Sequence, residues 1–162
     1  MTNTEHAFAH LLGLTAVDAQ KGHGSFIHFS LADSGDQSKE TAWVCIYMCH
    51  WRIVDQGTEM AHSESSDSEI LAAASRIDGR RLESIVLHKY VTPDGIRHGA
   101  SLVFEHRLTV KLYQYDHTSE VDSMFSSRGT SGSWASYESD GTIETKKEAE
   151  QDEPQQPPLA AL

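Results

Sequence analysis

Apolar and polar residues alternate with a period of two along several stretches of this chain, as is typical of half-buried β-strands. The clearest alternation runs over residues 84–113 and is interrupted by the turn-forming sequence TPDG at residues 92–95. We therefore predict a meander here, in which strands follow one another through hairpins. Its apolar positions are Ile85, Leu87, Leu102, Phe104, Leu108, Val110 and Leu112.

Shorter strand signals precede this meander. Strands are predicted over Leu14–Gln20 and Ser25–Ala32, with the turn residues Lys21–Gly24 between them. The most apolar stretch of the chain is Thr41–Val54, which reads TAWVCIYMCHWRIV. Its content of Trp, Val, Ile and Tyr favours a central strand that is buried on both sides over part of its length.

The segment that follows the meander is predicted to be mostly irregular. Residues 116–132 are rich in serine and are interpreted as a long loop, anchored by Met124 and Phe125. After this loop, Ser133–Ser139 and Thr142–Thr145 flank an Asp-Gly turn, which predicts a closing hairpin.

One segment of the chain carries a clear helical pattern. Ser66 with Glu69 three residues later matches a capping box, in which each side chain binds a backbone N–H of the other residue. Ile70, Ala74 and Ile77 then follow at helical spacing and form one apolar stripe. The pattern predicts a helix that begins at residue 66 and ends at the Asp-Gly pair at residues 78–79.

These elements together predict an α+β domain over residues 1–146. It contains a mainly antiparallel sheet, arranged as a meander that could curve strongly, with one central helix and a short N-terminal helix over Thr4–Leu12. Residues 147–162 read KEAEQDEPQQPPLAAL and cannot bury enough apolar surface to offset their ordering entropy. We predict that they form a disordered acidic tail rich in proline and glutamine.

The net negative charge of the chain limits the kinds of binding partner that we expect. The 162 residues include 24 acidic and 13 basic residues and carry a formal net charge of −11. A nucleic acid or a membrane surface that demands a basic patch is therefore not expected as a partner. The sequence shows neither an apolar run of about 20 residues nor a basic stretch followed by an apolar one, so we expect a cytoplasmic protein.

Catalytic motifs are missing from the sequence, so no catalytic residue, metal site or cofactor is predicted. The two cysteines are flanked by apolar residues, which favours buried and inert thiols. The abundance of histidine, with ten residues, leaves one alternative open. That alternative is a small metal- or His-dependent hydrolase that uses His88, Glu105 and His106, or Cys49 with His50.

Acidic residues concentrate between Ile53 and Ser75, a stretch that contains no Lys or Arg. Such a cluster could be a solvated helix start with its preceding loop, or an acidic face that docks a basic partner. The docking hypothesis names five candidate contacts: Asp55, Glu59, Glu64, Asp67 and Glu69.

A third hypothesis concerns three aromatic residues of the most apolar stretch. Trp43, Tyr47 and Trp51 could line a small-molecule pocket beneath the sheet. The alternative for the two tryptophans is that they pack in the core or on the sheet.

A series of short segments follows a distinctive order along residues 10–145. They are Leu11–Leu14, Trp51–Ile53, Glu64–Ser68, Ile77–Arg80 with Leu82, Leu102 with Phe104, Leu108 with Val110 and Leu112, Trp134, and Asp140 with Gly141. In this order the sequence resembles a set of small bacterial proteins, some of which are immunity-like proteins of polymorphic toxin systems. The resemblance implies a cytoplasmic immunity role, and it defines no catalytic residue. The absence of catalytic motifs, the acidic balance and the acidic cluster favour a non-enzymatic binding protein, such as an immunity protein that occludes a basic toxin domain through an acidic face.

Overall fold

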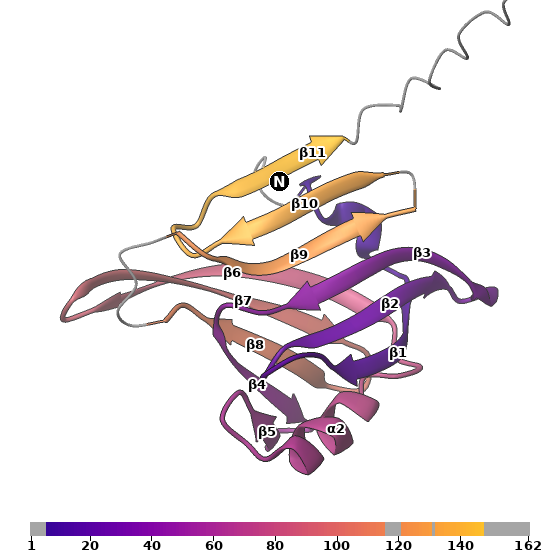
Figure 1. Ribbon diagram of the computed structural model, residues 1–162, viewed down its shortest axis with the longest axis horizontal. Coiled ribbons are helices and arrows are strands. Elements are labelled where there is room, and N and C mark those ends of the chain that lie inside the picture. The colour runs from indigo at the N-terminus through magenta and orange to yellow at the C-terminus, as the bar shows by residue number, and fades with distance from the viewer. Residues whose placement is uncertain (1–5, 116–120, 131, 148–162) are drawn as a thin grey trace, which may run out of the picture.

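The computed structural model of the chain describes residues 6–115, 121–130 and 132–147 (Figure 1). The described residues form two antiparallel sheets, which we call sheet A and sheet B. Sheet A has the strand order β1-β2-β3-β9-β10-β11, and sheet B has the order β5-β4-β8-β7-β6. The predicted acidic tail lies outside the described residues, apart from its first position.

The strands of sheet A are β1 (Thr15–Lys21), β2 (Ile27–Asp33), β3 (Asp36–Ile46), β9 (Ser123–Gly129), β10 (Ser133–Glu138) and β11 (Ile143–Lys147). The strands of sheet B are β4 (His50–Asp55), β5 (Thr58–His62), β6 (Leu82–Thr92), β7 (Gly95–Phe104) and β8 (Leu108–Tyr113). The helical elements are the 3-10 turn η1 (Ala9–Leu11) and the helix α2 (Asp67–Ser75).

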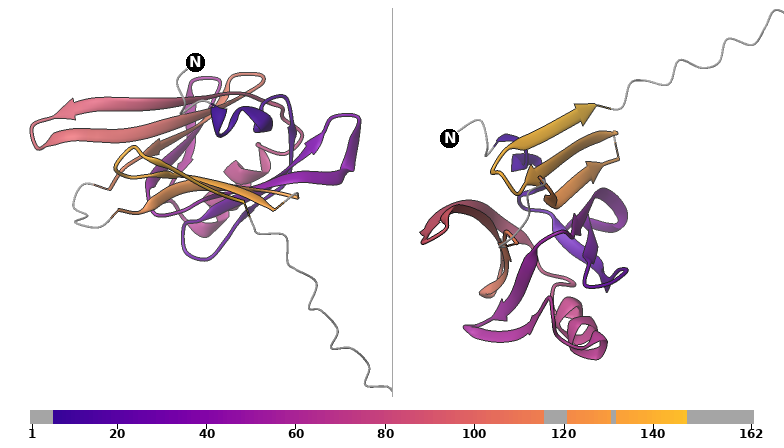
Figure 2. Two further views of the ribbon diagram at one scale, coloured as in Figure 1. Left: turned by 90° about the horizontal axis from the view of Figure 1, so that it is seen from above. Right: turned by 60° about the vertical axis from the view of Figure 1, so that its left-hand side comes forward.

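The two sheets form layers that enclose the core, and α2 lies with β5 at one end (Figures 1 and 2). In β2, β4 and β8, buried and less buried residues alternate, so the apolar half of these patterns faces the core. Across the core, the rings of Phe29 on β2 and Phe104 on β7 lie 5.8 Å apart. Before β1, Phe8 packs against Phe125 of β9 at 4.7 Å, so the N-terminal turn covers part of sheet A.

Several sequence-based predictions are confirmed. The structure is mainly antiparallel, and β6, β7 and β8 form the expected meander, with Thr92 paired to Gly95 at its first hairpin. The capping box is also present, because Ser66 Oγ accepts a hydrogen bond from the Glu69 amide and Glu69 accepts one from the Ser66 amide.

The central strand predicted over Thr41–Val54 is wrong. The chain leaves β3 at Ile46 and enters β4 at His50, and these two strands belong to different sheets. Inward-facing residues are apolar on both sides of this crossover, so the hydrophobic pattern does not reveal the break. Cys45 and Cys49 therefore lie in sheet A and in the crossover before sheet B, instead of on one strand.

Two other predictions need correction. The Ser-rich segment predicted to be a loop contains β9, which pairs with β3 and β10 near the middle of sheet A. The helix predicted over Thr4–Leu12 lies partly outside the described residues, and its described part ends in a 3-10 turn at Ala9–Leu11. Among the described residues, no helix is long and apolar enough to cross a membrane.

Candidate functional site

The two thiols are shielded by the fold. Cys49 is buried, and its Sγ lies 3.6 Å from the carbonyl oxygen of Met124 as a hydrogen-bond donor. Burial raises the pKa of Cys49 well above its usual range and raises the pKa of Cys45 to about 11. Because the thiolate is the nucleophilic form, neither side chain is prepared for nucleophilic attack near neutral pH.

The residues of the hydrolase hypothesis are separated along the β6–β7 hairpin. His88 pairs with Gly99, whereas Glu105 and His106 follow the end of β7, in the turn that leads to β8. Six residues of strand separate Gly99 from Glu105, which is about 20 Å at 3.3 Å per residue. Within the described parts of the chain, no three His, Cys, Asp or Glu side chains are grouped so that they could hold a metal ion.

Among the five acidic candidates, Asp55 is buried and forms ion pairs within the chain. It is 6% exposed at the end of β4, and its Oδ2 lies 3.0 Å from Arg76 Nη1 and 3.1 Å from Arg80 Nη2. These two arginines follow α2, so the buried carboxylate ties the end of the helix to sheet B. Asp55 is therefore not on an exposed docking face.

The other four acidic candidates are exposed at the end of the molecule formed by β5 and α2. Three of them have partners in the chain: Glu59 pairs with Arg52, Asp67 pairs with Lys21, and Glu69 closes the capping box. Glu64 lies between β5 and the helix. These four residues therefore lie together at one end of the molecule, and three of them already have partners within the chain.

The three aromatic candidates do not line one pocket. Trp51 is buried in sheet B and donates a hydrogen bond from Nε1 to the Ser25 carbonyl oxygen at 2.7 Å. Tyr47 lies in the crossover with its ring 5.7 Å from that of Phe26. Trp43 is on β3 with 37% of its surface exposed. The break between β3 and β4 is the reason that they separate.

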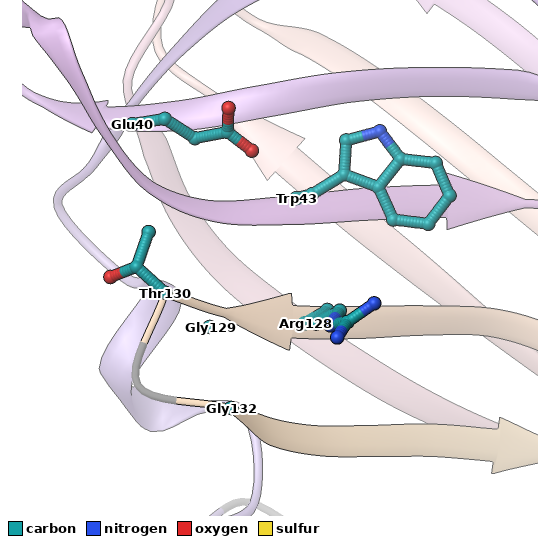
Figure 3. Close-up of a pocket in the computed structure, with 6 residues that line it drawn as sticks. All are labelled: Glu40, Trp43, Arg128, Gly129, Thr130 and Gly132. Carbon is teal, nitrogen blue, oxygen red and sulfur yellow. The ribbon is translucent and has the colours of Figure 1, made fainter. Parts of the chain in front are cut away.

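Trp43 instead borders a hollow of about 520 Å³ on the outer face of sheet A (Figure 3). Glu40 and Trp43 come from β3, and Arg128 comes from the neighbouring strand β9. Gly129, Thr130 and Gly132 complete the lining at the turn between β9 and β10. Figure 3 shows the Glu40 side chain extended toward the indole ring.

Strand register explains how these side chains meet. Arg128 is the direct partner of Trp43 across the β3–β9 ladder, so their side chains lie on the same face. Glu40 is three residues from Trp43, and in a regular strand the two would point to opposite faces. The register between β2 and β3 shifts between Leu31 and Ala32, and this irregularity allows both residues to line the same hollow.

The chemistry of this hollow is balanced in charge. One carboxylate, one guanidinium and one hydroxyl surround an exposed indole, and all three polar side chains are exposed. Oxygen atoms of Glu40 accept hydrogen bonds, Arg128 donates them, and Thr130 can do both. The arrangement can therefore hold a ligand that has a flat apolar face and polar groups of both kinds at its edge.

The pocket predicted from the sequence includes Trp43 and none of the other residues that line this hollow. Arg128 and Thr130 lie in the segment predicted to be a loop, and no local signal links them to a tryptophan more than 80 positions earlier. Residues 123–129 read SMFSSRG and show no alternation of apolar and polar positions, so the segment carries no local strand signal.

Comparison with known proteins adds no assignment, since no family model, curated protein or solved structure matches this chain.

Proposed function

We propose that this protein is a non-enzymatic binding domain, and that it holds a neutral, polyhydroxylated ligand such as a short saccharide in the hollow beside Trp43. The observation that carries this proposal is the exposed indole on a rigid sheet, with Glu40 and Arg128 at its border. Sites on strands hold their side chains more precisely than sites on loops.

The physical argument rests on the two faces of a sugar ring. The C–H groups of one face can pack against the indole of Trp43, which offers a large apolar surface with little side-chain entropy to lose. Each hydroxyl at the edge of the ring needs both a donor and an acceptor. Arg128 and Glu40 supply these without a net charge that would favour an anion or a cation.

The composition of the hollow also supports binding in preference to hydrolysis. Hydrolysis of a glycosidic bond ordinarily uses a pair of carboxylic side chains that flank the bond. Among the residues that line this hollow, Glu40 is the one carboxylic acid. The lining therefore supplies an acceptor for hydroxyl groups and lacks the pair that the reaction requires.

An NMR titration tests the proposal directly. The chain has three tryptophans, and the buried Trp51 provides an internal reference for the indole N–H signal of Trp43. Maltose, cellobiose, lactose and N,N′-diacetylchitobiose are titrated to about 20 mM, which detects Kd values in the millimolar range. We expect at least one of them to shift the Trp43 signal in a saturable way and to leave the Trp51 signal in place.

Matched variants separate the hollow from the rest of the sheet. Binding by the variants is followed through the backbone amide signals of Arg128 and Gly129, which line the hollow and remain in every variant. Trp43→Ala should abolish the shifts of these amides, and Glu40→Ala should weaken binding by about tenfold, as expected for a lost hydrogen bond to a charged group. Glu144→Ala removes an exposed carboxylate of β11 that does not line the hollow, and this variant should bind normally. If none of the four disaccharides shifts the Trp43 signal, or if Trp43→Ala binds as well as the unmodified chain, the proposal is wrong.

A second candidate function is the occlusion of a basic protein, such as a toxin domain, by the end of the molecule formed by β5 and α2. It is supported by the exposure of Glu59, Glu64, Asp67 and Glu69 at this end, because complementary charge steers association. The buried Asp55 is not part of this surface. An immunity role of this kind is what the sequence resemblance implies.

The partner for this second test is the protein encoded by the neighbouring gene, if that protein is basic. Reversal of charge at Glu59, Glu64 and Asp67 together should weaken binding and reduce its dependence on salt. Reversal at Glu144, which lies on β11 of sheet A, is the control. Unchanged binding by the triple variant would exclude this surface.

A further inference from the structure

A second hollow, of about 370 Å³, lies on the outer face of sheet B and is centred on Gly99 of β7. Gly99 pairs with His88 on β6 and with Tyr113 on β8, so the hollow spans three adjacent strands. None of these residues belongs to the site beside Trp43.

The floor of this hollow is backbone. A Cβ atom placed on Gly99 would lie 2.6 Å from the carbonyl oxygen of Leu112, a distance that real Cβ atoms do not adopt. It would also lie 3.7 Å from Cε1 of Tyr90. A side chain is therefore excluded at this position, where Gly99 is buried beside the Tyr90 ring and forms part of the floor.

Two tyrosine rings form aromatic walls. The rings of Tyr90 and Tyr113 lie 6.5 Å apart in an edge-to-face arrangement, with an interplanar angle of 76°. The guanidinium of Arg52 lies 5.6 Å from the centre of the Tyr113 ring, which adds a cation–π contact and holds the ring in place. A flat ligand can stack on such rings with little reorganisation of the site.

The charge of the lining is opposite to that of the chain. The side chains of Lys111 and His88 share the face of Gly99 and line the hollow, whereas Lys89 is paired with His98 and points to the other face of the sheet. The lining includes no acidic residue. The whole chain, by contrast, has 24 acidic and 13 basic residues. His88 Nε2 and Ser101 Oγ are 2.8 Å apart, which places a polar pair at the rim. This local excess of positive charge favours an anion.

From these features we infer that the hollow around Gly99 binds a planar anion of the size of one nucleotide. The planar part lies against Tyr90 and Tyr113, and the anionic group is held near the ammonium group of Lys111. The volume lies at the lower end of the range for small-molecule sites, which fits one such molecule. This site is independent of the proposed saccharide site, because it uses the other sheet.

Three probes separate the two parts of the inference. Adenosine 5′-monophosphate carries a plane and an anion, adenosine carries the plane alone, and inorganic phosphate carries the anion alone. Binding is followed by the NMR shifts of the Gly99 and Ser101 amides at low salt. We expect the nucleotide to shift these amides in a saturable way, and both partial probes to bind at least about fivefold more weakly.

Two variants locate the charge contact. Lys111→Glu should weaken the binding of adenosine 5′-monophosphate by at least about tenfold, because it replaces electrostatic attraction by repulsion. The same change at Lys146, which lies over Trp134 on sheet A, should leave nucleotide binding unchanged. Circular dichroism of both variants confirms that they are folded before the titration is interpreted.

Three results would overturn the inference. The first is equal binding of adenosine and the nucleotide, and the second is equal loss in the Lys111 and Lys146 variants. The third is a thymidine oligonucleotide that binds the same amides about a hundredfold more tightly than the mononucleotide, because that result would identify a single-stranded nucleic acid as the ligand.

Discussion

The two hollows lie on the outer faces of different sheets and are built by opposite means. On sheet A, side chains stand around a gap, and Trp43, Glu40 and Arg128 supply its chemistry. On sheet B, the gap exists because Gly99 has no side chain and the carbonyl group of Leu112 occupies the space where one would begin. The first hollow can therefore be altered with little effect on folding, whereas the second is part of the backbone packing.

The largest expected effect comes from Gly99→Ala. Because the new Cβ would overlap a backbone atom, the ladder between β7 and β8 must move, at a cost of about 1–3 kcal/mol in the free energy of unfolding. Urea unfolding measures this cost. Gly35→Ala is the control, since a Cβ there meets only Asp33 Oδ1 at an ordinary 3.5 Å, and its effect should stay within about 0.5 kcal/mol.

Trp43→Ala completes this comparison on the other sheet. The side chain is 37% exposed, so its removal should cost less than the 3–5 kcal/mol, approximately, of a fully buried Trp→Ala change. If Gly99→Ala were as stable as the unmodified chain, the distinction between a backbone-built and a side-chain-built hollow would be lost.

A smaller effect is expected from Tyr137→Phe, which tests the link between the two sheets. The buried Tyr137 of β10 donates a hydrogen bond from Oη to the Gly99 carbonyl oxygen at 3.3 Å. Its loss removes a buried hydrogen bond between the sheets, at a cost of about 1 kcal/mol, measured by urea unfolding. Tyr47→Phe is the control, because it keeps the ring contact with Phe26. Equal effects of the two changes would argue against the link.

The next effect is a pH dependence of the free energy of unfolding, which we expect from His98 near the start of β7. The ring of His98 lies against Gly141 of the β10–β11 turn. Burial, and then the charge of Lys89, lower the pKa of His98 below its usual 6.5, while Asp140 opposes this shift. The unfolded chain thus binds more protons than the folded chain below pH 6.5, so the free energy of unfolding falls as the pH decreases through this range.

Urea unfolding at about pH 7.5 and pH 5.5 measures this pH dependence. His98→Gln should reduce the difference between the two pH values. The pKa of Asp140 is lowered by hydrogen bonds from Thr142, so its contribution is lost only at much lower pH, below 3.8. An unchanged pH dependence in the His98 variant would assign the effect to another group.

The smallest effect is a change in labelling rate without a change in stability. Cys45 is two residues after Trp43 on the same face of β3, about 7 Å away. The disaccharide that binds most tightly should slow the alkylation of Cys45 by iodoacetamide, and adenosine 5′-monophosphate should not. Mass spectrometry follows the reaction, which is slow at pH 8 because the pKa of this thiol is about 11.

Cys49 supplies the internal control for the same experiment. It is buried and its thiol donates to the Met124 carbonyl, so it should be alkylated only when the chain unfolds. If the nucleotide protected Cys45 as well as the disaccharide does, the two sites would not be independent.

The sequence predicted those elements whose signals are local. The capping box of Ser66 and Glu69 lies within four residues, and the alternation of β6, β7 and β8 runs along adjacent strands joined by short turns. Contacts of this kind depend on neighbours that are close in the chain, so the pattern of residue types is sufficient to indicate them.

The missed elements depend on distant partners. β9 contains small polar residues, and Ser126 and Ser127 are buried because β3 and β10 flank them in the sheet. The crossover between Ile46 and His50 was hidden for the opposite reason, since apolar residues continue through it. A strand signal read from one segment cannot show which sheet that segment joins.

The acidic residues show the same division. Negative charge is concentrated between Ile53 and Ser75 in the sequence, but in the structure the buried Asp55 pairs with Arg76 and Arg80. A buried acidic residue that pairs with arginines and one that faces solvent look the same in a sequence, because the difference between them lies in the partner.

The sequence by itself determined the strand-rich composition of the fold, the meander, the position of the helix and the uneven charge. Only the tertiary structure decided that the strands divide into two sheets, which aromatic residues are exposed, and that Trp43 meets Arg128. Residue types set local conformation through sterics and hydrophobic periodicity. Register between distant strands sets which side chains share a face, and both hollows arise from that register.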